Sequence, residues 1–246
     1  MSESFQIYVS SKNGDLYKNN LLNNVEFYLP MIEIDDLYHI YLSVTNASIP
    51  VSWYNINLNN NVLVYGIVGG STYNISLPVG NYNVTTLLSK LISVMPNFNI
   101  TYSSLTNKFT FTHVSLDFVF HSSSSNCFSI LGFTKYDQYS ISRVLTSVNC
   151  INLSPVRSFI IGTSLRTGNI NLADPLVQNI LCSIPIISNS LGVVNYVNSD
   201  NFRTNLSTNV LNSLSIHITD QDANNIDFNG VNWFITLQLD IIKYID

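Results

Sequence analysis

Short apolar runs of strand length, separated by turn-forming residues, recur along most of this chain and constrain its fold more than any other feature. The run 37–49, LYHIYLSVTNASI, alternates apolar and polar residues and ends at Pro50. A period of two places successive side chains on opposite faces of a strand, so one face can be buried. The runs predicted to be strands of a sandwich are 24–31, 37–49, 140–149, 157–165, 178–187, 191–197, 210–219 and 232–244.

A jelly roll has eight antiparallel strands in two four-stranded sheets, which is the number of strands predicted here. We therefore predict a mainly β fold with an eight-stranded sandwich, although strand spacing alone also fits an immunoglobulin-like sandwich. The last run is long and apolar, which favours a central position in its sheet. Trp233 lies there among Val231, Ile235 and Leu237, and we expect it to be a buried core anchor.

The pattern changes between residues 53 and 135. Apolar residues follow a helical period from Val84 to Met95, with Asn83 placed to cap the first turn and Pro96 to end the helix. We predict that residues 53–135 form a small α+β domain, inserted into a jelly-roll domain made of residues 1–52 and 136–246. The other elements expected in this domain are the hairpins 62–77 and 98–114 and a strand at 116–120.

Charge is scarce in this sequence. Charged residues make up 10% of the 246 residues and hydrophobic residues 46%, with 34 Asn, 32 Ser and only three Ala. This composition argues against a helical bundle and against intrinsic disorder. The net charge is −5 and the ten basic residues are scattered, so we predict no nucleic-acid binding. Weak charge repulsion would let a face of the molecule associate with copies of itself.

The sequence gives no sign of membrane insertion or secretion. No apolar stretch is long enough for a membrane span, and the first residues lack the pattern of a signal peptide. Cys127, Cys150 and Cys182 form no C-x-x-C pair, so we expect reduced thiols in an intracellular setting.

Motifs for catalysis are missing as well. The sequence contains no G-x-S-x-G, H-E-x-x-H or P-loop pattern. His121 lies near Cys127, but the loop HSSSSNC that joins them offers no partner to orient the imidazole, and a structural role is favoured for all four histidines. We predict that the chain is not an enzyme and needs no cofactor.

One polar segment, 220–230, contains closely spaced side-chain oxygens. Asp220, Asp222 and Asn224 match the first ligands of a calcium-binding loop, but Asn225 and Val231 occupy positions that require Gly and Glu. We therefore favour a structural turn without a metal ion, in which side chains accept hydrogen bonds from backbone N–H groups. The residues assigned to this turn are Asp220, Asp222, Asp227, Asn229 and Gly230.

The segment 214–242, LSIHITDQDANNIDFNGVNWFITLQLDII, resembles the C-terminal signature of penton and minor capsid proteins from virophages, polinton-like viruses and related large DNA viruses. The departures are Asn225, where Gly is expected, and Asn232, where Asp is common. The pieces FQIYVSSKNGD, ISLPVGNYNVTTLLSKL and NILCSIPI are similar to further parts of the family and follow in the same order. The residues that match the C-terminal signature are Thr219, Asp220, Asp222, Ile226, Asp227, Phe228, Asn229, Gly230, Trp233, Thr236 and Leu237.

This resemblance implies a single jelly roll with an inserted domain, in a structural capsid protein that occupies the five-fold vertices of an icosahedral double-jelly-roll capsid. It implies a place in the virion, assembly inside the infected host cell, a homopentamer, and contacts with trimers of the major capsid protein. Two other roles stay open. The chain could be another minor capsid protein that cements neighbouring trimers, or a vertex-borne receptor- or glycan-binding protein that uses residues 53–135.

Overall fold

The computed structural model describes residues 2–16, 22–35, 37–169 and 179–243 of the chain. These residues divide into two compact units, one formed by Met1–Trp53 with Val156–Asp246 and the other by Tyr54–Pro155. The prediction placed the second boundary at residue 135, and the structure moves it to residue 155. None of the helices in the described ranges is long and apolar enough to cross a membrane.

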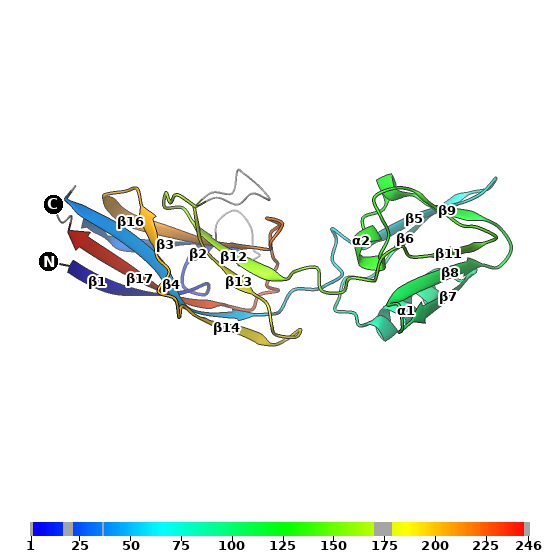
Figure 1. Cartoon of the computed structure of the whole chain (residues 1–246), viewed down its shortest axis with the longest axis horizontal. Coiled ribbons are helices and arrows are strands. Elements are labelled where there is room, and N and C mark those ends of the chain that lie inside the picture. The colour runs from blue at the N-terminus through cyan, green and yellow to red at the C-terminus, as the bar shows by residue number, and fades with distance from the viewer. Residues whose placement is uncertain (1, 17–21, 36, 170–178, 244–246) are drawn as a thin grey trace. The chain divides into compact units, whose positions relative to one another are not determined.

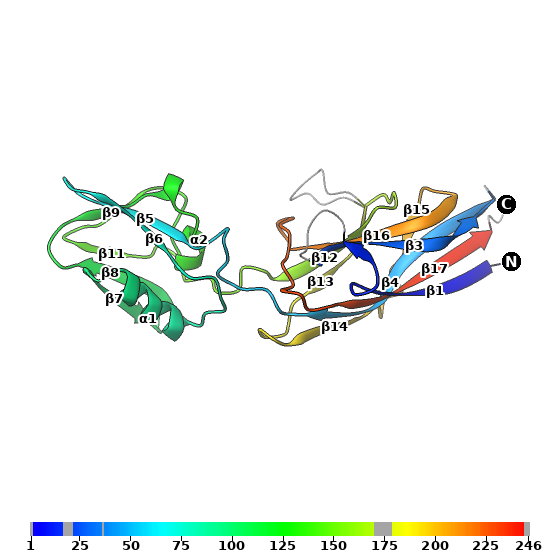
Figure 2. The same cartoon turned by 180° about the vertical axis from the view of Figure 1, so that it is seen from behind.

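The first unit contains two antiparallel sheets (Figures 1 and 2). The long strands run in the order β1-β17-β4-β14 in one sheet and β13-β12-β16-β3 in the other, with β15 paired to β4 and β2 to β3. Successive long strands alternate between the sheets except for β12 and β13, which is the jelly-roll topology. The bounds are β1 (Ser2–Ser10), β2 (Asp15–Leu16), β3 (Asn24–Glu33), β4 (Tyr38–Pro50), β12 (Ser158–Thr163), β13 (Ile180–Pro185), β14 (Val193–Val197), β15 (Thr204–Leu206), β16 (Val210–Thr219) and β17 (Phe234–Lys243).

Seven of the eight predicted sandwich strands are present, and β17 is central, between β1 and β4. The ends of two predicted runs, residue 178 and Tyr244, lie outside the described residues. The expected strand 140–149 was wrong, because its residues belong to the second unit. Its place in the sandwich is taken by β1, which pairs with β17 along its whole length.

Alternation along the strands explains the core of this unit. In β17, Ile235, Leu237 and Leu239 are buried, while the residues between them are partly exposed. Leu239 pairs with Leu42 of β4, which is also buried, so neighbouring side chains of the two strands face the core together. The opposite sheet contributes Phe27, Phe159 and Ile216, among others, to the same cluster.

The second unit contains a four-stranded sheet, a three-stranded sheet and one full helix. The sheet orders are β10-β9-β5-β6 and β11-β8-β7. Both predicted hairpins form, as β5 with β6 and β7 with β8. The bounds are β5 (Val62–Ile67), β6 (Thr72–Ser76), α1 (Val84–Val94), β7 (Phe98–Ser103), β8 (Lys108–His113), β9 (Phe118–Phe120), η1 (Ser122–Ser124), α2 (Phe128–Leu131), β10 (Gln138–Tyr139) and β11 (Val144–Thr146).

Helix α1 follows the sequence prediction closely. Asn83 caps it in a capping box, in which the Asn83 side chain accepts from the Thr86 backbone N–H and the Thr86 hydroxyl accepts from the Asn83 backbone N–H. Leu87 and Leu91 of the predicted apolar stripe are fully buried. They belong to a core rich in phenylalanine, in which Phe111 and Phe120, for example, meet edge to face with 5.1 Å between ring centroids.

Candidate functional site

The turn after β16 is built around the carboxylate of Asp220, which is almost fully buried. Asp220 Oδ1 accepts hydrogen bonds from the backbone N–H of Asp222 at 2.9 Å and of Asn224 at 2.8 Å. The Asn224 side-chain amide donates to Asp220 Oδ2 at 3.0 Å. A carboxylate surrounded by N–H donors in this way is suited to fixing a loop.

A second carboxylate holds the other half of the turn. Asp227 Oδ1 accepts from the Asn229 backbone N–H at 2.8 Å. Asn229 has a φ of 49° and Gly230 a φ of 76°, a left-handed conformation that Gly and Asn adopt most readily. The Asn229 side-chain amide reaches back to the Ser52 carbonyl at 2.6 Å, which ties the turn to the end of β4.

Asp222 differs from this pattern. We expect from the sequence that its carboxylate accepts backbone N–H groups, but in the structure it accepts from the Gln221 side chain instead. Trp233 is fully buried, as expected, although it lies one residue before β17 begins. Its indole N–H donates to the Leu22 carbonyl at 2.7 Å.

We propose that this turn is architectural, and its two carboxylates allow a graded test. Asp227→Ala should lower the free energy of unfolding by about 0.5–2 kcal/mol, as the loss of a capping-type hydrogen bond does. Asp220→Ala should have the larger effect, because it removes a buried carboxylate that accepts from two backbone N–H groups and from the Asn224 side chain. Asp222→Ala is the control and should stay within about 0.5 kcal/mol of wild type. Urea denaturation would measure all three.

A calcium-dependent rise in melting temperature that disappears in Asp220→Ala and in Asp222→Ala would contradict this proposal. It would show that the same oxygens bind a metal ion. Within the described residues, no group of three or more His, Cys, Asp and Glu side chains is arranged to hold a metal.

The loop that contains His121 is more ordered than the sequence indicated. His121 Nδ1 lies 3.3 Å from Asp137 Oδ2, so the imidazole has an orienting partner that the loop 121–127 itself does not supply. The Ser122 backbone N–H and hydroxyl both donate to Asp137 Oδ1, and the backbone bond is the main reason that the pKa of Asp137 lies below its usual value. Burial raises the pKa of the Cys127 thiol to about 12, so this cysteine is a neutral core residue and unsuited to act as a nucleophile.

His217 of β16 packs directly over Gly162 of β12. A Cβ atom at position 162 would collide with His217 Nε2, so glycine is what leaves room for the ring beside the neighbouring strand. Burial lowers the pKa of His217, because the protonated imidazole loses its hydration there.

The lowered pKa predicts a pH dependence of stability. Above pH 6.5, the ordinary value for histidine, the ring is neutral in both states and contributes no pH dependence. As the pH falls below 6.5, the unfolded chain takes up a proton that the folded chain resists, so stability should decrease until the folded-state pKa is passed. Denaturation between pH 7.5 and pH 5 should show a smaller decrease in His217→Gln than in wild type, and equal decreases would contradict the assignment.

The outer face of the first sheet carries a polar network that sequence reasoning missed. The Arg203 guanidinium lies 4.4 Å from the centre of the Tyr41 ring and 3.9 Å from Asp240 Oδ2. Asp240 Oδ1 also accepts from the Ser4 hydroxyl and from the Gln238 side chain. The pairing of three strands brings these side chains together, because Ser4, Asp240 and Tyr41 lie opposite one another in β1, β17 and β4. No local sequence motif indicates the cluster.

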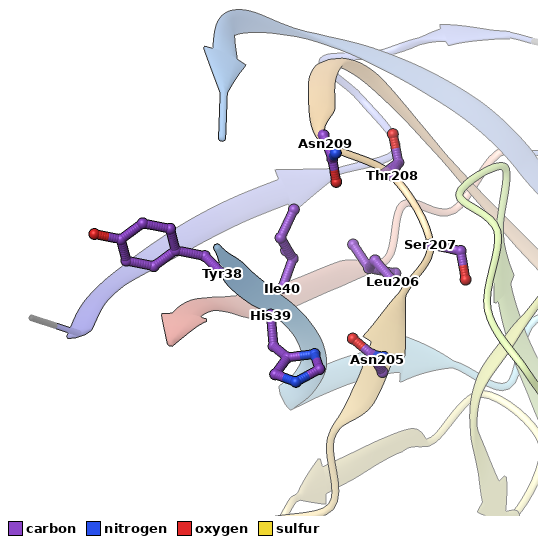
Figure 3. A pocket seen from close by; sticks show the side chains of 8 residues that line it. All are labelled: Tyr38, His39, Ile40, Asn205, Leu206, Ser207, Thr208 and Asn209. Carbon is purple, nitrogen blue, oxygen red and sulfur yellow. The ribbon is translucent and has the colours of Figure 1, made fainter. Parts of the chain in front are cut away.

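A shallow hollow of about 320 Å³ lies near the start of β4, beside β15 (Figure 3). Its walls are mostly uncharged polar groups, and the His39 and Asn205 side chains lie on the same side of it in Figure 3. No Asp, Glu, Lys or Arg side chain lines it within the described residues, and its polar side chains come from His39, Asn205, Ser207, Thr208 and Asn209, together with the Tyr38 hydroxyl. The lining residues are Tyr38, His39, Ile40, Asn205, Leu206, Ser207, Thr208 and Asn209.

The arrangement of the first unit defines a jelly-roll protein, and the comparison with solved structures found chains that are similar to it over nearly their whole length. The chain is similar to the mavirus penton protein, with a TM-score of 0.50 and 12% identity over 99% of this chain and 100% of that one. It also matches a chain in the structure of the Sputnik virophage, with a TM-score of 0.45 and 13% identity over 98% of each chain. No family model and no curated protein matches the sequence.

At such low identity the likeness to the mavirus protein establishes the fold. It therefore confirms the jelly-roll fold that the resemblance to penton and minor capsid proteins implied.

Proposed function

We propose that the chain is a structural protein of a viral capsid and that it is a penton, placed at the five-fold vertices of an icosahedral shell. The observation that carries this proposal is the likeness to the mavirus penton protein, which extends over essentially the full length of both chains. The protein would be located in the virion and have no catalytic role. Its partners would be further copies of itself, as a homopentamer, and trimers of the major capsid protein.

The surface of the first unit supports lateral packing between copies. The side chains of Tyr8 and Phe234 are well exposed on the outer face of the first sheet, and those of Tyr28 and Met31 are well exposed in β3 of the other sheet. A five-fold ring joins two different patches of each subunit, one on each neighbour. Exposed aromatic side chains among neutral polar groups can be buried there with little desolvation of charge.

Cryo-electron microscopy of the particle would test this proposal. Density for this fold is expected at the five-fold vertices, in five copies, with the outer sheet faces at the contacts between subunits. Density between neighbouring trimers, away from the vertices, would show a cement protein instead. Binding on a glycan array that persists in the isolated protein would favour the receptor- or glycan-binding role.

A further inference from the structure

A second hollow, of about 700 Å³, lies at one edge of the sandwich in the first unit. Residues of β13 and β14, the edge strands of the two sheets, line it together with residues of the connection from β14 to β15. Backbone hydrogen bonds join strands within a sheet and not across the sandwich, so space between two edge strands is open unless side chains fill it. Tyr196 of β14 and Asp200 and Phe202 of the connection all line this hollow. We call these three residues the edge site.

The connection that presents Asp200 and Phe202 is held in place by its own hydrogen bonds. The Asn198 side-chain amide donates to the Phe202 carbonyl at 2.7 Å, and the Asn198 side-chain oxygen accepts from the Phe202 backbone N–H at 3.0 Å. The Asn198 backbone N–H donates to the Thr45 carbonyl of β4 at 2.9 Å. The Phe202 side chain is nevertheless 51% exposed. A ring that is kept exposed on a fixed connection offers a ligand an aromatic surface at little cost in ordering.

The charge at this hollow is negative. Asp200 is the one charged residue among the described residues that line it. The Asp200 carboxylate accepts from the Ser199 hydroxyl at 3.3 Å, and no basic side chain in the described part of the chain forms an ion pair with it. Arg203 lies close in sequence, but its guanidinium is directed to the Tyr41 ring and to Asp240. The carboxylate at the hollow is therefore available to a cation from outside.

The side chains at the hollow favour a guanidinium group over a neutral sugar. A sugar needs several amides or hydroxyls that are free to bond it, and the one side-chain amide that lines the hollow is already engaged. Asn169 donates to the Ile180 carbonyl at 2.8 Å and to the Thr204 hydroxyl at 3.0 Å. A guanidinium group is planar, weakly hydrated and rich in N–H donors, so it can stack on aromatic rings and pair with a carboxylate at the same time.

We propose that the edge site binds an arginine side chain of a partner protein, with the guanidinium group against the rings of Phe202 and Tyr196 and paired with Asp200. Arginine is enriched at protein interfaces, often at the positions that contribute most to binding. The charge of the unit acts in the same direction, because the chain outside residues 54–155 has six basic and thirteen acidic residues, a formal charge of −7. The edge site does not depend on the capsid assignment, and neither proposal falls with the other.

Titration of the full-length protein with N-acetylargininamide, followed by NMR of labelled Tyr and Phe side chains, would test the proposal. The signals of Tyr196 and Phe202 should shift and saturate at millimolar probe. N-acetylcitrullinamide, which has nearly the same shape without the charge, should shift them much less. Asp200→Asn and Phe202→Leu should each weaken binding about two- to fivefold, the range for an exposed ion pair or cation–π contact. The two replacements together should weaken it about tenfold.

Asp222→Asn and Phe234→Leu are the matched controls. They change an exposed carboxylate and a ring that is 56% exposed elsewhere on the same unit, and both should bind the probe as wild type does. Melting temperatures of all variants should stay close to wild type, since the replaced side chains are exposed. The proposal would be overturned by the absence of saturable shifts, by equal binding of the citrulline compound, or by an equal loss in the controls. Shifts of the same signals by methyl glucoside, without any by the arginine compound, would show a sugar site instead.

Discussion

Trp233→Ala is expected to lower the free energy of unfolding by about 3–5 kcal/mol, the range for loss of a buried aromatic side chain. Trp233 is fully buried and meets Phe27 of the opposite sheet edge to face, with 6.4 Å between ring centroids. Its indole N–H donates to the Leu22 carbonyl, and its backbone N–H donates to the Ser11 hydroxyl at 3.1 Å. The replacement would therefore open a cavity in the core and leave the Leu22 carbonyl without its indole donor.

Two variants make this result interpretable. Phe234→Ala removes the neighbouring aromatic side chain, which is 56% exposed, and should change stability by no more than about 0.5 kcal/mol. Trp233→Phe keeps an aromatic ring but loses the hydrogen bond to Leu22, so an intermediate loss of about 1–3 kcal/mol is expected. If urea denaturation gave Trp233→Ala the stability of wild type, the ring would not be part of the core.

The long strands and the helix could be predicted because each has a strong local pattern. The alternation in β4 and β17 follows directly from burial on one face, and the stripe of α1 with its Asn83 cap is a property of twelve consecutive residues. Pairing of short segments is different, because it depends on partners distant in sequence. Leu145 of β11 is buried in the second core, where it pairs with Phe111 of β8. The sequence near residue 145 does not show whether this strand belongs to the second unit or to the sandwich.

The candidate sites show the same limit. The side-chain bonds of Asp220 and Asp227 span at most four residues, so Asp and Asn at turn spacing were enough to predict them. The Asn229 bond to Ser52 spans 177 residues, and the contact between His121 and Asp137 spans 16.

Removal of residues 54–155, with Trp53 joined to Val156 through a short Gly-Ser linker, is expected to leave a folded β-sandwich. Every buried residue of the first core lies in the ranges 9–51 and 159–239, and every buried residue of the second lies between 56 and 145. The two cores have no described residue in common, so deletion of one should leave the packing of the other intact. Cooperative unfolding with a β-type circular dichroism spectrum would be the expected result.

The deletion of residues 53–135, at the boundary expected from sequence, is the matched comparison and should be much less stable. It leaves β10 and β11 without their partners β9 and β8. It also removes Trp53, which meets Phe159 edge to face with 5.4 Å between ring centroids, and loss of this ring alone should cost about 2 kcal/mol or more. Equal melting temperatures for the two deletions would contradict the boundary at residue 155. A core that is complete in its own residues needs no other part of the chain to fold. If the 54–155 deletion protein were unfolded at low temperature, the sandwich would therefore depend on the second unit.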